Sequence, residues 1–268
     1  MDEWKKVKLG DICQTNLETY SLSEKWDFVN YLDTGSLTKN VVSEYQEINL
    51  PNDKLPSRAR RKISVNDILY STVRPNQEHY GIVKEVVPNM LVSTGFTVIS
   101  VNQEFADSDF IYYCLTRREV IEHLQAIGEQ STSAYPSIKP TDIENLELFL
   151  PSLNEQGEIA SVLRVLDDKI ENNRKINHHL EQIGTTIWQE KFSDKIPNGT
   201  LGDIAIISSG KRPPVKTTVP TDEEKIPILG ASSIMGYTNQ ALYHQKILVT
   251  GRVGTHGIIQ RYQRSCWP

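Results

Sequence analysis

Residues 151–192 read PSLNEQGEIASVLRVLDDKIENNRKINHHLEQIGTTIWQEKF, and this stretch decides the fold. After Pro151 its apolar residues recur every three or four positions and no proline interrupts them, which predicts one long helix. Asn154 can cap this helix, and Glu155 and Glu158 favour its first turn because carboxylates stabilise the positive end of the helix dipole. About 38 residues at about 1.5 Å each make a rod of roughly 57 Å.

A heptad series runs along the predicted helix: Ile159, Leu166, Asn173, Leu180 and Ile187. Such spacing is typical of a coiled-coil seam, where a buried Asn fixes the register at a cost in stability. The helix interface is expected to consist of Ile159, Leu163, Leu166, Ile170, Asn173, Ile176, Leu180, Ile183 and Ile187. A long helix packed along a globular core is the alternative, but the length of the segment favours a rod that separates two parts of the chain.

The sequence repeats itself on either side of this helix. Four short motifs occur in the same order in both flanks: LGDI at 9–12 and 201–204, VNYL at 29–32 and IPIL at 226–229, ILYSTVR at 68–74 and ILVTGR at 247–252, and HYGIV at 79–83 and THGII at 255–259. Their offsets differ only as loop insertions would make them, so we interpret the flanks as copies of one domain. The second copy stops at Cys266-Trp267-Pro268, which corresponds to about residues 90–92 of the first.

Each copy has the pattern of short strands broken by turns. In the first copy β-branched and aromatic runs bounded by turn residues predict strands at Val7–Ile12, Phe28–Leu32, Asp67–Ser71, Gly81–Val87 and Phe96–Val101. A helix is expected near Ser108–Ile127. The predicted fold is therefore mixed α+β, with related domains at 1–151 and 196–268, the second incomplete, separated by a coiled-coil helix at 152–195.

Composition limits the class of protein. An apolar fraction of 38% with no apolar run near the roughly 20 residues of a membrane span, and no signal-peptide pattern at the start, predict a cytoplasmic globular protein. Cys13, Cys114 and Cys266 lie far apart and are odd in number, which excludes a disulfide framework and a CxxC metal site. We interpret them as buried or surface thiols.

Charge is unevenly distributed along the chain. The net charge of −5 argues against a surface uniformly suited to phosphates, but Lys54–Lys62 (KLPSRARRK) holds five basic residues and no acidic one. Arg, Asn and Gln are also the side chains that bond bidentately to guanine and adenine edges. The first copy offers these candidate DNA-binding residues: Arg58, Arg60, Arg61, Lys62, Arg74, Asn76, Gln77, Tyr80, Ser131 and Tyr135. In the second copy the parallel candidates are Lys211, Arg212, Arg252, Thr255 and His256. The alternative for each loop is an ordinary solvated connection.

Catalytic motifs were sought because an enzyme is the rival class. Gly251–Gly257 lacks GxGxxG spacing, Gly210-Lys211 lacks the rest of a Walker A loop, and His178-His179 lacks HExxH spacing. No GxSxG elbow occurs, nor the Asn-or-Asp-Pro-Pro-aromatic tetrapeptide with which amino-methyltransferases hold a flipped base. We therefore expect no catalytic centre, metal or cofactor in the chain, and any methylation would come from a partner.

The order LGDI, then DILYSTVRP at 67–75, then residues 134–182 resembles the DNA-specificity subunits of type I restriction-modification enzymes, most strongly over Pro151–Gln182. The resemblance covers the whole chain. It implies two target-recognition domains, joined by antiparallel helices, that each read half of a bipartite site in double-stranded DNA. It also implies separate methyltransferase subunits and, through them, a restriction or motor subunit that cuts.

The sequence departs from that pattern at its C-terminal end, where the distal helix that would pair with 152–195 is missing. Self-association through the central helix is therefore expected as a further partnership. Two alternatives stay open: a coiled-coil adaptor that ignores DNA, in agreement with the acidic pI of about 5.7, and a half-subunit that must dimerise to bind DNA.

Overall fold

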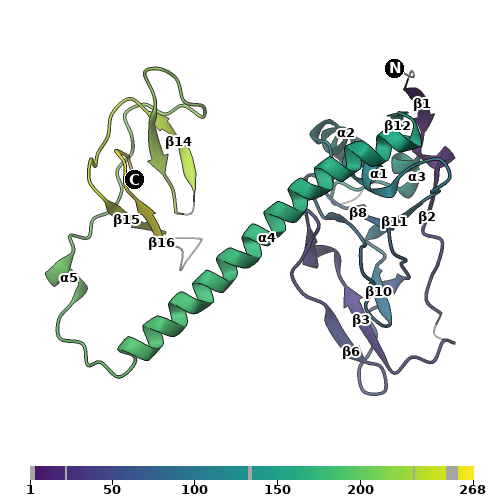
Figure 1. The fold of residues 1–268 in the computed structure, drawn as a ribbon, viewed down its shortest axis with the longest axis horizontal. Coiled ribbons are helices and arrows are strands. Elements are labelled where there is room, and N and C mark those ends of the chain that lie inside the picture. Colours follow the sequence, from purple (N-terminus) through teal and green to yellow (C-terminus); the bar gives the residue numbers. More distant parts are fainter. Residues whose placement is uncertain (1–3, 22, 132–134, 232, 252–258) are drawn as a thin grey trace. The chain divides into compact units, whose positions relative to one another are not determined.

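The computed structural model describes residues 4–21, 23–131, 135–231, 233–251 and 259–268. The chain divides into two compact units, Met1–Thr186 and Ile187–Pro268. Helix α4 (Leu153–Phe192) belongs mostly to the first unit and runs into the second (Figure 1). The architecture, a β-rich region followed by a long helix and small C-terminal sheets, confirms the predicted mixed α+β fold class.

Unit 1 is built from two four-stranded sheets and three short helices. Its strands are β1 (Lys5–Lys8), β2 (Cys13–Thr15), β3 (Phe28–Leu32), β4 (Leu37–Thr38), β5 (Val41–Val42), β6 (Gln46–Asn49), β7 (Ala59–Arg61), β8 (Ile68–Ser71), β9 (Tyr80–Ile82), β10 (Met90–Ser93), β11 (Phe96–Val101) and β12 (Glu147–Leu150). Its helices are α1 (Ser108–Leu115), α2 (Arg118–Glu129) and α3 (Pro140–Glu144), with 3-10 turns η1 (Leu9–Asp11), η2 (Thr34–Ser36) and η3 (Pro75–Gln77). The helices gather at one end of the unit and β3 and β6 lie toward the other (Figure 1).

The two sheets have the strand orders β6-β3-β10-β7 and β2-β11-β8-β9. Strands β3 and β10 run parallel, with Tyr31 opposite Leu91, and the other neighbours in both sheets are antiparallel. A separate antiparallel pair, β1 with β12, ties the start of the chain to the strand that leads into α4. The expected strands at 28–32 and 96–101 are confirmed as β3 and β11.

Hydrophobic clusters join these layers. One cluster packs α1 and α2 against the β2-β11-β8-β9 sheet, with Ile111 and Leu124 fully buried. A second lies between the two sheets around Phe96, and a third covers the outer face of β3 and β10 around Tyr20 and Leu91. Unit 1 is therefore a layered domain of helices, sheet and sheet, which is the arrangement that buries both faces of a sheet.

Three local predictions need correction. The strand expected over Gly81–Val87 is β9, which begins at Tyr80 and ends at Ile82. The helix expected over Ser108–Ile127 is two helices, because the backbone turns at Thr116 and becomes extended at Arg117, which precedes α2. The strand expected over Val7–Ile12 ends at Lys8, where the η1 turn carries Leu9 into the core. Apolar content alone could not distinguish a strand from a turn that buries the same side chains.

The first turns of α4 are fixed to unit 1 by polar contacts. Gln156 is buried: its amide nitrogen donates to the carbonyl of Pro151 at 3.0 Å and its Oε1 accepts from the backbone N–H of Asp107 at 3.0 Å. About two to three turns later, Arg164 pairs with Asp109 at 3.1 Å, and the hydroxyl of Tyr113 donates to Asp167 at 2.9 Å. These contacts orient the helix relative to the domain that precedes it.

The N-terminus and the inner face of α4 also differ from expectation. The cap is Ser152, whose Oγ accepts from the N–H of Glu155 at 3.4 Å, and Asn154 lies within the first turn, where it donates to Glu158. Ile159, the first member of the predicted helix interface, packs against the core of unit 1. It faces that core because it lies one turn after Gln156, on the side of the helix that the domain covers.

Beyond these turns the apolar stripe of α4 is exposed. The side chains of Leu166, Ile170, Ile176, Leu180, Ile183 and Ile187 are each about half exposed to solvent, and Leu163 is intermediate. Asn173 lies in the same stripe and is also exposed. A helix of 40 residues with such a stripe is unusual for an isolated surface helix and typical of one that pairs with another helix.

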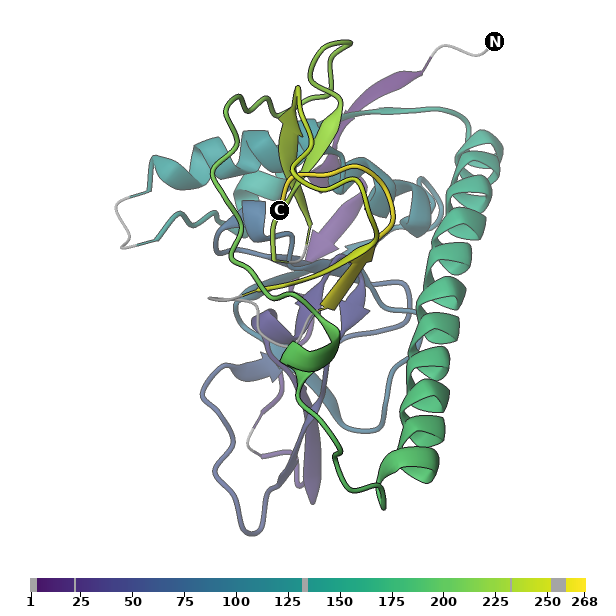
Figure 2. The same ribbon diagram turned by 90° about the vertical axis from the view of Figure 1, so that its left-hand side faces the viewer.

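Unit 2 contains α5 (Leu201–Ile204), β13 (Ile226–Leu229), β14 (Ile234–Thr238), β15 (Ile247–Thr250) and β16 (Ile259–Tyr262), which Figure 2 shows as two small antiparallel hairpins after a short helical turn. Ile228 forms a parallel bridge with Trp267. The repeat aligns Ile228 with Tyr31 and Trp267 with Leu91, so this bridge reproduces the parallel pairing of β3 with β10. Strands β15 and β16 are antiparallel, as β8 and β9 are, but Ile247 pairs with Tyr262, four residues beyond the position that the repeat aligns with Ile82.

Replacing Gln156 by Ala is expected to lower the free energy of unfolding of unit 1 by about 1–3 kcal/mol, since the N–H of Asp107 and the carbonyl of Pro151 would lose a buried partner. Urea unfolding followed by tyrosine and tryptophan fluorescence measures this. Gln182→Ala, on the exposed part of the same helix, is the matched control. Equal midpoints for the two variants would show that Gln156 does not anchor the helix.

Candidate nucleic-acid interface

Loops from five parts of unit 1 meet at one place, and we call them the loop cluster: residues 33–36, 56–58, 71–77, 93–95 and 135–138. The N–H of Thr94 donates to the carbonyl of Arg58 at 2.8 Å, and the N–H of Thr72 donates to that of Gly95 at 2.8 Å. A methyl group on Gly95 would lie 2.9 Å from the Thr34 side chain, which shows how closely these loops approach.

The segment 135–138 completes the cluster. The N–H of Ile138 donates to the carbonyl of Thr72 at 2.8 Å, and the N–H of Arg74 donates to that of Pro136 at 2.8 Å. Backbone hydrogen bonds between segments this distant in sequence hold their side chains in fixed relative positions. Loops positioned by a rigid scaffold are where proteins commonly place binding residues.

Within the basic run, only Arg58 joins the loop cluster. Its side chain is exposed, and its guanidinium lies near the Tyr31 hydroxyl: burial raises the pKa of Tyr31, and the positive charge of Arg58 opposes that rise. Arg60 lies one step along β7, where its carbonyl accepts from the N–H of Tyr20. Successive residues of a strand point to opposite faces, so the run cannot present all its charges on one surface.

Two further basic residues of the run, Arg61 and Lys62, have different surroundings. Arg61 is partly buried, burial lowers the pKa of its guanidinium, and its Nε has no hydrogen-bond partner within the described part of the chain. Lys62 pairs with Glu24 at 2.6 Å and lies 5.5 Å from the centroid of the Trp26 ring. The positive charge of Lys62 is therefore already matched inside the domain.

The turn after β8 places three of its four predicted residues at the surface. Asn76 and Gln77 are exposed in η3, and the N–H of Asn76 donates to the side chain of Gln125 in α2. Arg74 is half-buried, with its guanidinium carbon 4.4 Å from the centroid of the Tyr135 ring.

Tyr80 lies in the core, which differs from its predicted place on a DNA-facing loop. Its ring is 7% exposed and stacks on Tyr70 with 5.8 Å between centroids, and burial raises the pKa of its hydroxyl to about 12. The reason is local: β9 begins at Tyr80, so this side chain belongs to the sheet and not to the preceding turn. We leave Tyr80 out of the candidate interface.

The remaining candidates divide between the two units. Ser131 follows α2, its hydroxyl accepts from that of Ser137 at 3.4 Å, and the ring of Tyr135 is exposed. In unit 2, Lys211 and Arg212 are exposed, and the carbonyl of Lys211 accepts from the indole N–H of Trp267 at 2.6 Å. Arg252, Thr255 and His256 lie outside the described residues.

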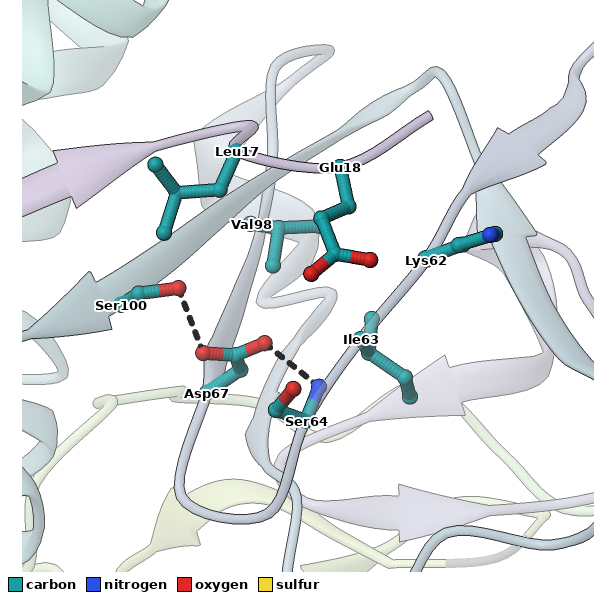
Figure 3. Close-up of a pocket in the computed structure, with 8 residues that line it drawn as sticks. All are labelled: Leu17, Glu18, Lys62, Ile63, Ser64, Asp67, Val98 and Ser100. Atoms are coloured by element: carbon teal, nitrogen blue, oxygen red, sulfur yellow. Dashed lines mark hydrogen bonds between the residues drawn. The ribbon is translucent and has the colours of Figure 1, made fainter. Parts of the chain in front are cut away.

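A small polar pocket beside β8 holds the most buried carboxylate of unit 1's loops. In this cavity of about 40 Å³, Asp67 accepts from the N–H of Ser64 at 2.7 Å and from the hydroxyl of Ser100 at 2.6 Å (Figure 3). Both carboxylate oxygens thus hold the turn that starts β8, and the space fits about one water molecule. None of the residues that line this pocket belongs to the loop cluster.

The ionisation of Asp67 gives a pH-dependent prediction. Burial raises the pKa of its carboxyl above the ordinary 3.8, so its charged form is less stable in the fold than in the unfolded chain. The difference in unfolding free energy, wild type minus Asp67→Asn, should therefore be greatest at low pH and should fall as the pH rises through the raised pKa. The hydrogen bonds that the variant loses add a contribution to this difference that does not depend on pH. Urea unfolding of both proteins from pH 4 to 7 measures this difference, and a difference that grew with pH would contradict it.

The described residues offer little to metal or thiol chemistry. Among them no group of three or more His, Cys, Asp or Glu side chains could hold a metal ion. Burial raises the pKa of Cys13 to about 12 and that of Cys114 to about 11, which makes both thiols poor nucleophiles at neutral pH. In the part of the chain that the structure covers, no helix combines the length and apolar character needed to cross a membrane.

Unit 1 is thus a two-sheet domain whose loops carry Arg, Asn, Gln and Tyr side chains, and a long helix follows it. The chain belongs to the family of type I restriction-modification DNA specificity domains, whose pattern matches residues 1–182. Members of this family form the specificity component of type I restriction-modification enzymes and not the catalytic component. This agrees with the expectation from the sequence that the chain has no catalytic centre.

Two curated relatives show the extent of the likeness. The chain is 32% identical over 202 residues to the type I restriction enzyme HindI specificity subunit of Haemophilus influenzae, and 25% identical over 255 residues to the MjaIX specificity subunit of Methanocaldococcus jannaschii. These matches include 74% and 84% of this chain but 42% and 56% of the relatives. The chain thus spans about half the length of the curated relatives it matches.

Solved structures agree on the fold. The crystal structure of the HsdS subunit from Thermoanaerobacter tengcongensis superposes with a TM-score of 0.55 at 21% identity, over 100% of this chain and 73% of that one. A type I restriction-modification S subunit from M. genitalium gives a TM-score of 0.50 at 20% identity, over 98% of this chain and 69% of that one. At such identities the likeness concerns the fold alone.

Proposed function

We propose that the chain is a DNA-specificity subunit that reads one half of a bipartite duplex site through the loop cluster of its first domain. It directs partner methyltransferase subunits to that site and, through them, a restriction or motor subunit. The domains are 1–151 for recognition, 152–195 for the helical spacer and 196–268 for a partial second recognition domain, and the place of action is the cytoplasm. The observation that carries the proposal is the meeting of Arg58, Arg74 and Tyr135 in one loop cluster of a family member.

The physical roles follow from side-chain chemistry. Arg58, exposed and without an ion pair to the described carboxylates, suits a phosphate, which fixes the position of the domain on the duplex without reading sequence. Arg74, Asn76 and Gln77 carry the donor and acceptor pairs that distinguish bases in the major groove. Lys211 and Arg212 would serve the second domain in the same way as Arg58 serves the first.

Selection from a pool of random duplexes tests the proposal. The full chain in complex with its methyltransferase subunit should enrich a defined sequence, and each enriched position should lose binding when its base pair is changed. Binding to all duplexes alike, or to none, would favour the adaptor function, in which the chain joins proteins and does not read DNA.

We further propose that the exposed stripe of α4 pairs with a second copy of the chain. In an antiparallel pair of helices centred midway between Asn173 and Asn177, Asn173 of each copy lies opposite Asn177 of the other. The same register brings Ile170 opposite Leu180 and Leu163 opposite Ile187, so two apolar pairs lie on each side of the polar layer, while Leu166 lies opposite Gly184.

This self-complementarity favours a second copy over a partner of different sequence. Two copies would also bring two first domains to one DNA molecule, as a bipartite site requires. The alternative is that the stripe packs on the methyltransferase subunit. The measured mass of the complex would then correspond to one copy of the chain and not two.

A further inference from the structure

The backbone of Arg74 has an unusual conformation. Its φ of 48° lies in the left-handed region, which side-chain-bearing residues other than Asn and Asp seldom adopt. Neighbouring groups hold it there: its N–H donates to the carbonyl of Pro136 at 2.8 Å, and its carbonyl accepts from the N–H of Gln77 at 2.8 Å. An antiparallel bridge between Val73 and Ser137 fixes the residue before it. Strain maintained in this way is typical of functional positions.

The side chain of Arg74 is held as well. Its guanidinium lies over the face of the Tyr135 ring, 4.4 Å from carbon to centroid, and that ring is 57% exposed. Within the described residues Arg74 forms no ion pair with a carboxylate. Stacking occupies the face of a guanidinium and leaves the N–H donors along its edge able to bind something else.

The ligand that fits a planar fork of N–H donors is a pair of acceptors in one plane. Guanine presents such a pair, O6 and N7, in the major groove, and a bidentate Arg is its commonest partner. A phosphate also binds Arg bidentately, but a phosphate contact carries no sequence information and needs no strained, pre-oriented side chain. The exposed Asn76 and Gln77 beside Arg74 would extend the readout to neighbouring base pairs.

We propose that Arg74, held in position by Tyr135, reads a guanine in the half-site of the first domain. This inference rests on the proposed function and assigns one base of the target to one side chain. Arg74 is the specificity-determining residue, and Tyr135 is the positioning residue that orients its guanidinium.

Duplex selection by the full chain, in complex with its methyltransferase subunit, tests this with three variants. Arg74→Lys keeps the charge but not the fork, so preference for guanine at one position should fall roughly tenfold or more while the other positions keep theirs. Tyr135→Leu should weaken the same position and no other, and Tyr135→Phe, which retains a ring, should restore it. Arg174→Lys on α4 is the matched control and should change no base preference, since Arg174 lies outside the loop cluster and forms an ion pair with Glu171 of its own helix.

The outcomes separate the inference from the function on which it rests. If wild type selects a sequence and Arg74→Lys retains every preference, Arg74 does not read a base and the inference is overturned, while the proposed function stands. If Arg74→Lys or Tyr135→Leu weakens all positions equally, the pair contacts phosphate or maintains the fold, and the inference is again overturned. If wild type selects no sequence, the proposed function itself fails.

Discussion

Replacement of Leu180 by Glu is expected to abolish self-association of the chain and raise the dissociation constant of the dimer at least about a hundredfold. In the proposed register Leu180 of each copy faces Ile170 of the other, so a single substitution alters two symmetric layers. Each Leu contributes about 1.5–3 kcal/mol when fully buried, and each introduced carboxylate would have to lose water beside an apolar partner.

Sedimentation or light scattering at tens of micromolar measures this effect. Gln182→Glu introduces the same carboxylate two residues further on, outside the apolar stripe, and should leave the association constant nearly unchanged. A monomeric wild type at these concentrations would contradict the pairing of two copies. If both variants lost association equally, the helices would associate through their charges and not through the apolar residues of the stripe.

Replacement of Arg58 by Glu is expected to lower DNA affinity by roughly 10- to 100-fold at low salt. The substitution removes one phosphate contact and adds a repelling charge, so the slope of log affinity against log salt should also fall in magnitude by about one. Binding to a selected duplex, titrated at several salt concentrations, measures both quantities.

Lys62→Glu is the matched control for this variant because it makes the same change in charge within the same basic run. Lys62 pairs with Glu24 and packs on Trp26, away from the loop cluster, so its substitution should leave the salt slope unchanged even where it lowers thermal stability. If both variants lost affinity and slope alike, the whole run would act as one basic surface, and the loop cluster would not be the contact.

The sequence predicted most reliably what depends on local periodicity. The existence and approximate length of helix α4 follow from a stripe of Ile and Leu without an interrupting proline, and β3 and β11 follow from β-branched and aromatic runs between turn residues. The prediction was wrong where two different structures bury the same side chains: Leu9 reaches the core from a 3-10 turn, and Ile111 and Leu124 belong to separate helices.

The candidate site depended on contacts that no local pattern encodes. Arg58 and Lys62 are four residues apart in one basic run, with strand β7 between them, and only the fold reveals that Glu24 neutralises Lys62. The sequence also grouped Arg74 with Tyr80, although one lies on a turn and the other begins a buried strand. The contact of Arg74 with Tyr135 spans 61 residues (135 minus 74) and became visible only in three dimensions.

The position of DNA on unit 1 tests the central claim most directly. A photo-crosslinking amino acid placed at Gln77, exposed in the loop cluster, should form a covalent adduct with a selected duplex. The same group at Glu122, on the exposed face of α2, should not. Adducts at Glu122 and none at Gln77, with a duplex that the protein binds, would place the DNA on another surface and contradict the account.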